Sequence, residues 1–160
     1  MNNISDLPIS HEGKYCLTIT DVKTGKVDYS EFFNTIMNDC LDELSKPLLG
    51  LSTNYQIKYL AVGSSSASVY TTQSQLGSEF FRTAVASQTK SGTGQVKTYF
   101  YILSTEATSS VIREVGIFCG TTASTVSNSG RMLSRILWTY DKTGGDKEIQ
   151  IERIDTIQKI

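Results

Sequence analysis

The segment from Val111 to Cys119 constrains the fold most, because it is apolar on both faces of a β-strand. Successive side chains of a strand leave on opposite sides of the sheet, so alternate residues share a face. Both alternating sets of this segment are apolar apart from Arg113 and Glu114, which point to opposite faces. A strand of this kind is covered on both sides, which predicts a central strand and not an edge strand.

Glu114 therefore needs a partner inside the protein. Burying a lone carboxylate costs several kcal/mol unless a cation or several N–H donors lie beside it. The segment from Leu76 to Arg82 contains the candidate cation, Arg82, and a second carboxylate, Glu79. We predict a structural ion pair in which Arg82 binds Glu114 or Glu79 through bidentate hydrogen bonds and joins the two segments.

The length of the chain favours one hydrophobic core that is stable without disulfides or bound metal ions. With 160 residues, a single domain is expected. Residues 1–13 carry no hydrophobic period, which predicts an N-terminal arm that is disordered or orders against a partner. Residues 14–160 are predicted to form a single β-rich domain. The scattered cysteines are interpreted as small buried hydrophobic residues and not as a disulfide framework: Cys16, Cys40 and Cys119.

The charge of the chain argues against two classes of partner. Its 15 basic and 16 acidic residues do not cluster by sign. Binding to duplex nucleic acid needs a basic face that displaces counterions, and anionic membranes attract basic clusters. No run approaches the ~20 apolar residues of a membrane span, and the polar N-terminus does not resemble a secretory signal. We therefore expect no nucleic acid and no membrane partner, and a cytoplasmic protein until it joins a larger assembly.

One segment has the period of a helix. Apolar residues recur every three or four positions between Phe33 and Leu44, and acidic and amide residues lie on the opposite side. This stripe predicts one amphipathic helix at about 30–45, packed on one face of the fold and ended by Pro47.

The rest of the chain is typical of short strands separated by glycine-containing turns. The expected strands are 14–20 with 27–29 as a hairpin, then 55–62, 81–85, 96–103, and a terminal hairpin of 131–140 with 147–154. Two serine- and threonine-rich stretches, 64–75 and 120–130, are expected to be loops that face solvent or order between subunits. The fold class is therefore mainly β (α+β): a β-sandwich-like antiparallel core with one amphipathic helix.

The sequence contains few residues in arrangements typical of an enzyme active site. Glu79, Glu106 and Glu114 could supply the paired carboxylates of a hydrolase, but a structural ion pair accounts for them better. The sole histidine, His11, lies in the weakly patterned N-terminal segment, with nothing around it to orient an imidazole. The chain contains no Gly-x-Ser-x-Gly, Cys-x-x-Cys, P-loop or Gly-x-Gly-x-x-Gly motif. We expect no catalytic residue, no cofactor and no metal site, and hence not an enzyme.

Aromatic side chains are the candidates for contacts with a partner or ligand. Along 96–103, tyrosines alternate with Phe100 and Ile102, so one face is expected in the core and the other against a partner. Aromatic rings also stack on sugars, so a host-receptor or carbohydrate-binding module is the alternative interpretation. Half-burial of tyrosine on a sheet explains the same residues without a ligand. The candidates are Tyr99, Tyr101, Trp138 and Tyr140.

Several short motifs occur in a fixed order. They are Thr24-Gly25-Lys26-Val27, Phe33-Asn34-Thr35, Ile57 to Gly63, Leu76 to Arg82, and Ile112 to Phe118 followed by a glycine and Met132-Leu133-Ser134-Arg135. This order resembles the small tail-fibre, collar or baseplate-type structural proteins of tailed bacteriophages. The resemblance covers the chain from Thr24 to its C-terminus.

The resemblance implies a non-enzymatic virion component of a phage tail, neck or baseplate. Such a protein is an oligomeric adaptor that anchors fibres or bridges tail components, assembled in the host cytoplasm. The implied partners are copies of itself in a symmetric oligomer and other phage tail or neck proteins, with a host surface glycan less expected. Longer relatives carry a fibre shaft after the hairpin; because this chain stops at Ile160, a short adaptor is expected. Residues matching motif positions would be architectural: Glu79, Arg82, Glu114 and Gly116.

Overall fold

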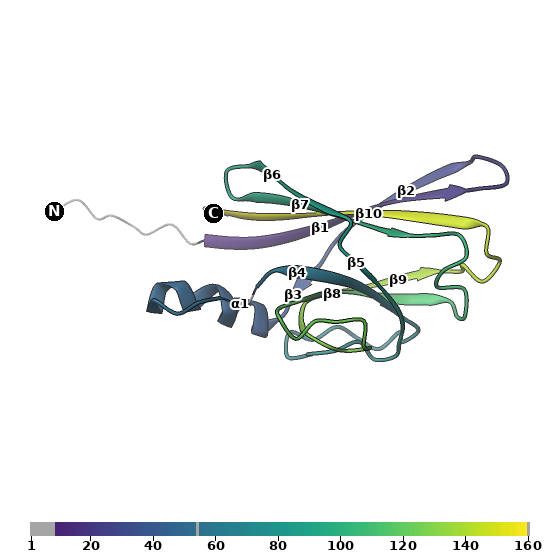
Figure 1. Ribbon diagram of the computed structural model, residues 1–160. Helices are drawn as coiled ribbons and strands as arrows, with labels where there is room; N and C mark the ends of the chain where they lie inside the picture. Colours follow the sequence, from purple (N-terminus) through teal and green to yellow (C-terminus); the bar gives the residue numbers. More distant parts are fainter. Residues whose placement is uncertain (1–8, 54, 160) are drawn as a thin grey trace.

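The computed structural model describes residues 9–53 and 55–159, which form two five-stranded antiparallel sheets packed face to face (Figure 1). In sheet A the order is β2-β1-β10-β7-β6, and in sheet B it is β3-β9-β8-β4-β5. The strands of sheet A are β1 (Ile9–Asp21), β2 (Val27–Phe33), β6 (Ser87–Gly92), β7 (Gln95–Ile102) and β10 (Lys147–Lys159). Those of sheet B are β3 (Thr35–Ile36), β4 (Ile57–Gly63), β5 (Glu79–Ala84), β8 (Ile112–Cys119) and β9 (Arg131–Tyr140). The predicted mainly β, sandwich-like fold is confirmed.

Strand β8 lies in the middle of sheet B, as its sequence predicts. Its inner side contributes Val115 and Ile117 to the core between the sheets. On the outer side, Phe118 packs with Leu76 and Met132 in a second, smaller cluster beneath the loops. The strand is therefore covered on both faces, which explains why both of its alternating sets are apolar.

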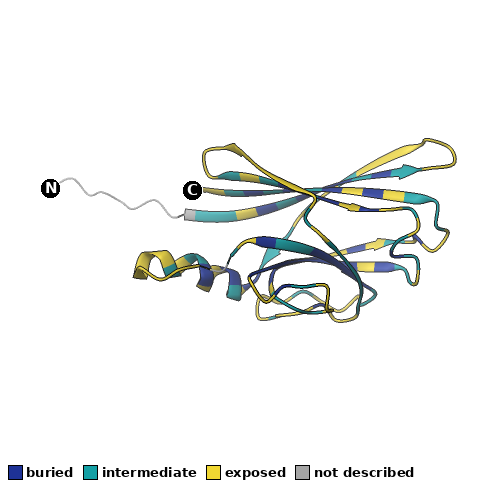
Figure 2. Cartoon of the chain, in the orientation of Figure 1, coloured by how far each residue is buried: buried dark blue, intermediate teal, exposed yellow. Residues whose placement is uncertain are grey.

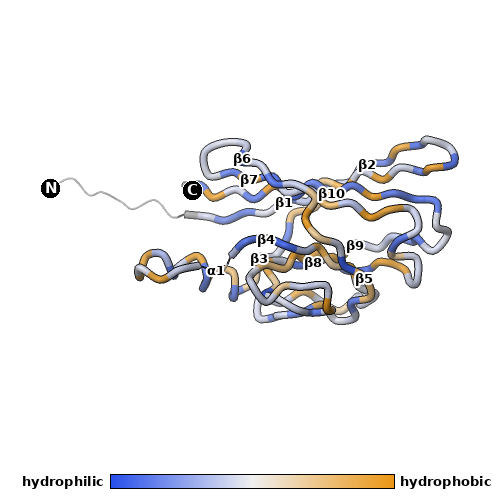
Figure 3. Tube along the Cα trace, in the orientation of Figure 1, coloured by the Kyte–Doolittle hydropathy of each residue, from blue (hydrophilic) through white to orange (hydrophobic). Residues whose placement is uncertain are grey.

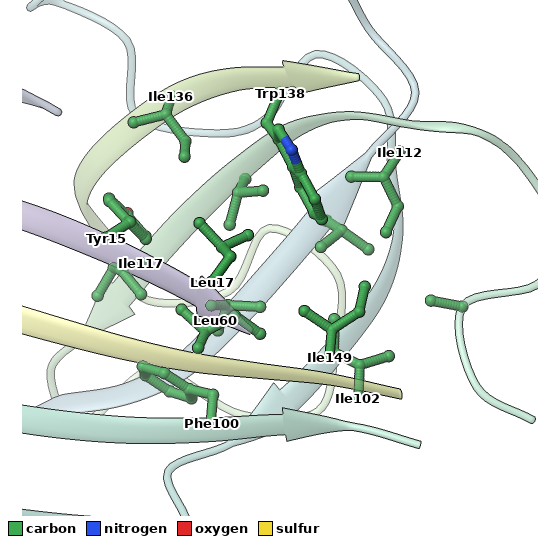
Figure 4. Packing of buried hydrophobic residues seen from close by; sticks show 14 of the residues in the cluster. Tyr15, Leu17, Leu60, Phe100, Ile102, Ile112, Ile117, Ile136, Trp138 and Ile149 are labelled. Atoms are coloured by element: carbon green, nitrogen blue, oxygen red, sulfur yellow. The ribbon is translucent and has the colours of Figure 1, made fainter. Parts of the chain in front are cut away.

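The main core is built from inward-facing side chains of both sheets. Figure 4 shows residues of this cluster from strands of the two layers, all of them buried: Leu17, Phe100, Ile102 and Ile149 from sheet A, and Leu60, Ile112, Ile117, Ile136 and Trp138 from sheet B. Full burial of one such side chain stabilises the fold by about 1.5–3 kcal/mol. This core accounts for the pairing of the two sheets.

The first and last strands pair along their whole length in the interior of sheet A. The register runs from Ile9 opposite Lys159 to Asp21 opposite Lys147. Residues 9–13, which the sequence assigns to an arm, are therefore the start of β1, because β10 continues far enough to pair with them. Residues 1–8 of the predicted arm lie outside the described residues. The β1–β2 hairpin forms as predicted.

The helix is shorter than its sequence pattern predicts. The α-helix α1 spans Asn38–Ser45 and is followed by the 3-10 helix η1 (Lys46–Leu49), which ends at Gly50 in a left-handed conformation (φ 72°). The predicted start near residue 30 is wrong, because 27–33 pair with β1 and 35–36 pair with β9. Within the described ranges, neither helix has the length and apolar character needed to cross a bilayer.

The predicted terminal hairpin is also wrong, because β9 belongs to sheet B and β10 to sheet A. Residues 141–146 instead carry the chain from one sheet to the other. Lys142 in this connection is fully buried, and its Nζ donates to the carbonyl oxygens of Leu103 (2.6 Å), Ser104 (2.8 Å) and Glu106 (2.6 Å). The side chain thereby fixes the neighbouring β7–β8 connection.

Candidate functional site

Charged residues form two neighbouring rows on the outer face of sheet B. The rows follow from the register, in which residues of β5, β4, β8 and β9 lie opposite one another. One row consists of Arg82, Ala61, Gly116 and Arg135. The other consists of Glu79, Gly63 and Glu114. In both rows, small residues separate the charged ones and leave room for their side chains.

Glu114 occupies the centre of this arrangement and is completely buried. Its Oε2 accepts hydrogen bonds from Arg135 Nε (2.8 Å) and the backbone N–H of Gly77 (3.1 Å). Its Oε1 accepts from the N–H groups of Ser78 (2.8 Å) and Ser65 (3.3 Å). Both oxygens are therefore satisfied by the protein itself, as a buried carboxylate requires.

Arg135 extends the same network into the loop that covers the sheet. Its Nη1 donates to the carbonyl of Ser68 (3.1 Å) and to Gln73 Oε1 (3.0 Å), and its Nη2 donates to the carbonyl of Ala67 (3.0 Å). Glu114 accepts hydrogen bonds from backbone N–H groups of loop 64–78, and Arg135 donates hydrogen bonds to backbone carbonyls of the same loop. The ion pair therefore fixes this loop through both kinds of backbone group.

Glu79 and Arg82 fix the other loop, 120–130, in the same way. The pair is bidentate, with Arg82 Nε 2.6 Å from Glu79 Oε1 and Nη2 2.8 Å from Oε2. Arg82 Nη1 donates to the carbonyls of Ser124 (2.9 Å) and Ser129 (3.2 Å), and Glu79 Oε2 accepts from the N–H of Asn128 (2.8 Å). The serine- and threonine-rich loops are thus ordered within one chain by buried charges.

The partner of Glu114 differs from the one the sequence favours. Arg82 binds Glu79, the other predicted carboxylate, and not Glu114, which binds Arg135. The reason is the strand order, since β4 lies between β5 and β8 and places Arg82 two strand spacings, about 10 Å, away. The sequence did contain a signal for Arg135, because it is the only charged residue in the mainly apolar segment 132–138 and is the last residue of the ordered motifs.

At two glycines of the motifs, neighbouring atoms leave no room for a side chain. A Cβ on Gly63 would lie 2.3 Å from Glu114 Oε1 and 2.6 Å from the carbonyl oxygen of Ser78. A Cβ on Gly116 would lie 2.8 Å from Leu76 Cδ2. The close backbone approach expected at Gly116 is present.

The four candidate aromatic residues do not form one platform. Trp138 is buried in the core, stacked on Tyr140 with ring centroids 5.0 Å apart. Tyr101 is 46% exposed and Tyr99 is half-buried, both on the outer face of sheet A, whereas Phe100 and Ile102 of the same strand face the core. The predicted division of β7 into a core face and an outer face is therefore correct, but Trp138 belongs to the core.

A pocket of about 340 Å³ is lined in part by residues of α1, β1 and β10. The start of β1, the end of β10 and α1 lie at the same end of the sandwich (Figure 1). Its walls are mainly apolar, and its polar groups come from the inner wall and from the rim. The apolar lining consists of Leu44, Tyr55, Ile57, Val96, Leu133 and Ile157. The polar lining consists of His11, Gln56, Gln88, Thr89, Lys90 and Asp155.

A buried polar network forms the inner wall of this pocket. His11 Nε2 lies 2.9 Å from Asp155 Oδ1, and Arg153 binds the same carboxylate through Nε (2.8 Å) and Nη2 (2.6 Å). Arg153 also donates to Ser134 Oγ, which lies 2.8 Å from the hydroxyl of Tyr15, so the network joins sheet A to sheet B. The imidazole is therefore well supported, contrary to the sequence-based expectation.

Charge interactions decide the ionisation of Asp155. Burial raises the pKa of this carboxyl. The Arg153 guanidinium and the hydrogen bond from His11 lower the pKa by more than burial raises it, so the pKa lies below its usual value. Asp155 is therefore the anion that balances the buried Arg153.

Cys40 lies next to this network, with its Sγ 3.7 Å from His11 Nδ1. Thiol, imidazole and carboxylate in this order are the arrangement of cysteine hydrolases. A nucleophilic thiol, however, is accessible and has a depressed pKa. Cys40 is only 2% exposed, and burial raises its pKa to about 11. The geometry therefore suits a buried structural thiol, as the sequence predicts for all three cysteines.

Across the part of the chain that the structure describes, no group of three or more His, Cys, Asp or Glu side chains could hold a metal ion. Comparison of the chain with protein-family models, curated proteins and solved structures finds no match.

Proposed function

We propose that this chain is a non-enzymatic structural subunit of a phage virion. In this proposal it acts as a symmetric oligomer in the tail, neck or baseplate, where it anchors fibres or bridges neighbouring tail proteins. Its partners are copies of itself and other virion proteins, which it joins after synthesis in the host cytoplasm.

The observation that carries the proposal is the convergence of the ordered motifs on one structural unit. The segments Ile57–Gly63, Leu76–Arg82, Ile112–Phe118 and Met132–Arg135 supply β4, β5, β8 and β9 of sheet B together with the start of its loop cover. Four of their charged residues bind the covering loops: Glu79, Arg82, Glu114 and Arg135. Gly63 leaves the room that the Glu114 carboxylate needs. Motif residues with this use favour a scaffold, because their polar atoms are hydrogen-bonded within the protein.

Exposed apolar side chains support the self-assembly part of the proposal. The α1–η1 segment projects at one end of the sandwich (Figure 2) and carries a group of exposed leucines that we call the leucine surface: Leu41, Leu48, Leu49 and Leu51. Leu48 is 89% exposed and Leu49 is 74% exposed. Figure 3 shows hydrophobic residues toward the tip of this segment. Grouped apolar residues on a surface mark contacts with other proteins.

The test is the oligomeric state of the full chain together with its place in particles. Native mass spectrometry and light scattering are expected to give one discrete oligomer, and immunogold labelling is expected to mark the tail or neck of intact virions. The double variant Leu48→Glu/Leu49→Glu should weaken assembly, whereas Thr125→Glu/Ser127→Glu, at two exposed loop positions, is the charge-matched control. A strictly monomeric protein that is absent from particles would overturn the proposal.

A glycan-binding module of the tail remains the second candidate, and the exposure of Tyr101 is the observation that favours it. A glycan array is the appropriate measurement. Specific binding that is lost in Tyr101→Ala but retained in Leu48→Glu/Leu49→Glu would replace the scaffold proposal with a receptor-binding one.

A further inference from the structure

We propose that the pocket beside α1 binds residues 1–8 of a second copy of this chain. The inference rests on the proposed self-assembly and assigns one contact that contributes to it beside the leucine surface. Each copy would then donate one N-terminal segment and accept another.

The pocket has the chemistry of a peptide-binding site. Its volume of about 340 Å³ falls in the range of small-ligand pockets, about 300–1,000 Å³. Apolar side chains remain open to solvent at its rim, where Val96 is 39% exposed and Ile157 is 44% exposed. The exposed side chains of Gln56 and Gln88 stand at the same rim and can donate to and accept from a peptide backbone. A short segment with a few apolar side chains fits these walls.

Residues 1–8 match this chemistry and join the described chain beside the pocket. Their sequence, Met-Asn-Asn-Ile-Ser-Asp-Leu-Pro, contains two branched apolar residues, Ile4 and Leu7, and one carboxylate, Asp6. The first described residue, Ile9, is two positions before His11, which lines the pocket. Lys90 lies on the rim and is complementary in charge to Asp6.

The direction of β1 favours a second copy over the chain's own segment. β1 begins at Ile9 and passes His11 on its way into the sheet, so the pocket lies on the inner side of the chain's point of entry. To enter its own pocket, the segment would have to reverse immediately before Ile9. Eight extended residues span up to about 26–29 Å, enough to reach a neighbouring copy.

Removal of the segment is the first part of the test. A chain of residues 9–160 is expected to keep its thermal melting transition but to self-associate at least about tenfold more weakly in sedimentation or light scattering. In the full chain, Leu7→Asp should have the same effect, and Asn3→Asp, which adds the same charge at a polar position, should not. Unchanged association of the 9–160 chain would overturn the inference and leave the proposed function standing.

Binding of the segment as a free peptide tests the pocket itself. A fluorescently labelled peptide of residues 1–8 is expected to bind the 9–160 chain in an anisotropy titration. Val96→Asp, at the rim, should raise the Kd at least about tenfold, whereas Val126→Asp, at an exposed position of the outer loop, should leave it unchanged. A peptide that does not bind, or that binds both variants equally, would show that the pocket serves another occupant.

Disulfide trapping distinguishes the two sources of the segment. We expect a mixture of two single variants, Leu7→Cys and Gln88→Cys, to form an intermolecular disulfide under mild oxidation, while Leu7→Cys mixed with Ser127→Cys does not. A double variant that closes the bond within one chain, with none formed in the mixture, would assign the pocket to the chain's own segment and overturn the inference. A full chain that is monomeric and absent from virions would instead overturn the proposed function.

Discussion

Glu114 illustrates how single residues hold this fold together. The side chain is completely buried and charged, yet it receives donors from one guanidinium and three backbone N–H groups. Removing one partner of such a pair is costly because the other charge stays buried without compensation. At this scale, the charged residues of sheet B determine where the loops lie.

Replacing Glu114 with glutamine tests this role. Glu114→Gln keeps the shape of the side chain but leaves the buried guanidinium of Arg135 without its anion, which should lower the free energy of unfolding by about 3–5 kcal/mol. Hydrogen exchange should also speed up in loop 64–78. Urea unfolding measures the first effect, with the exposed Glu148→Gln as control. A variant as stable as the parent would contradict the importance of the pair.

Replacing Gly63 with alanine tests the space beside the same carboxylate. The new Cβ would stand 2.3 Å from Glu114 Oε1, so either the carboxylate or β4 must move. Overpacking of this kind costs about 1–3 kcal/mol. At Gly92 the nearest atom would lie 3.9 Å away, so Gly92→Ala is the matched control in thermal melts. Equal melting temperatures for the two variants would mean that the site adapts at no cost.

The sequence identifies the buried carboxylate but not its partner. Glu114 stands out because its neighbours are apolar on both faces, and that pattern depends only on local alternation. The choice between Arg82 and Arg135 depends on which strand lies beside β8, and this is a long-range property. The same holds for His11, whose support from Asp155 comes from the other end of the chain.

At the scale of secondary-structure elements, pairing with neighbouring strands determines the structure of several segments whose local hydrophobic pattern predicts something else. The stripe of apolar residues around 33–44 has helical spacing, but Phe33 pairs with β1 of sheet A and Ile36 pairs with β9 of sheet B. Residues 9–13 have weak strand character of their own, and β10 makes them a strand. The Gly-Gly turn before β10 suggests a hairpin, but the chain uses it to change sheets. Local periodicity predicted which segments are strands better than it predicted which strands are neighbours.

The connection between the sheets yields a prediction of its own. Lys142→Met keeps most of the buried stem but leaves the carbonyls of Leu103, Ser104 and Glu106 without their shared donor. Loss of a buried hydrogen-bond partner costs about 1–3 kcal/mol, so the melting temperature should fall by several degrees. Differential scanning calorimetry measures the shift, and Lys23→Met, at an exposed lysine, is the control. A shift no larger than that of the control would show that water replaces the ammonium.

The whole molecule is expected to lose stability in acid. The pKa of Asp155 is lowered in the folded state, as are those of Asp21, Glu31 and Asp141. A lowered folded pKa gives stability that is present above the unfolded value, about 4, and is lost as the pH falls below it. Urea unfolding between pH 5 and pH 2 should show this fall.

The variant Asp155→Asn should be less stable than the parent at pH 5 but should lose less stability on acidification, because one of the responsible carboxyls is gone. Parallel pH profiles for the parent and the variant would exclude Asp155 as a contributor. The variant Asp42→Asn, at an exposed position, serves as the control, with a profile expected to follow that of the parent.

The pairing of β1 with β10 has a consequence for synthesis in the cell. The ribosome makes β1 before every other described strand and β10 after all of them, and their register places Ile9 opposite Lys159. The strands of sheet B are all made before β10, so that layer can assemble on the nascent chain. Sheet A cannot close until β10 has left the ribosome, because β10 lies between β1 and β7, so both of these strands lack a neighbour until then.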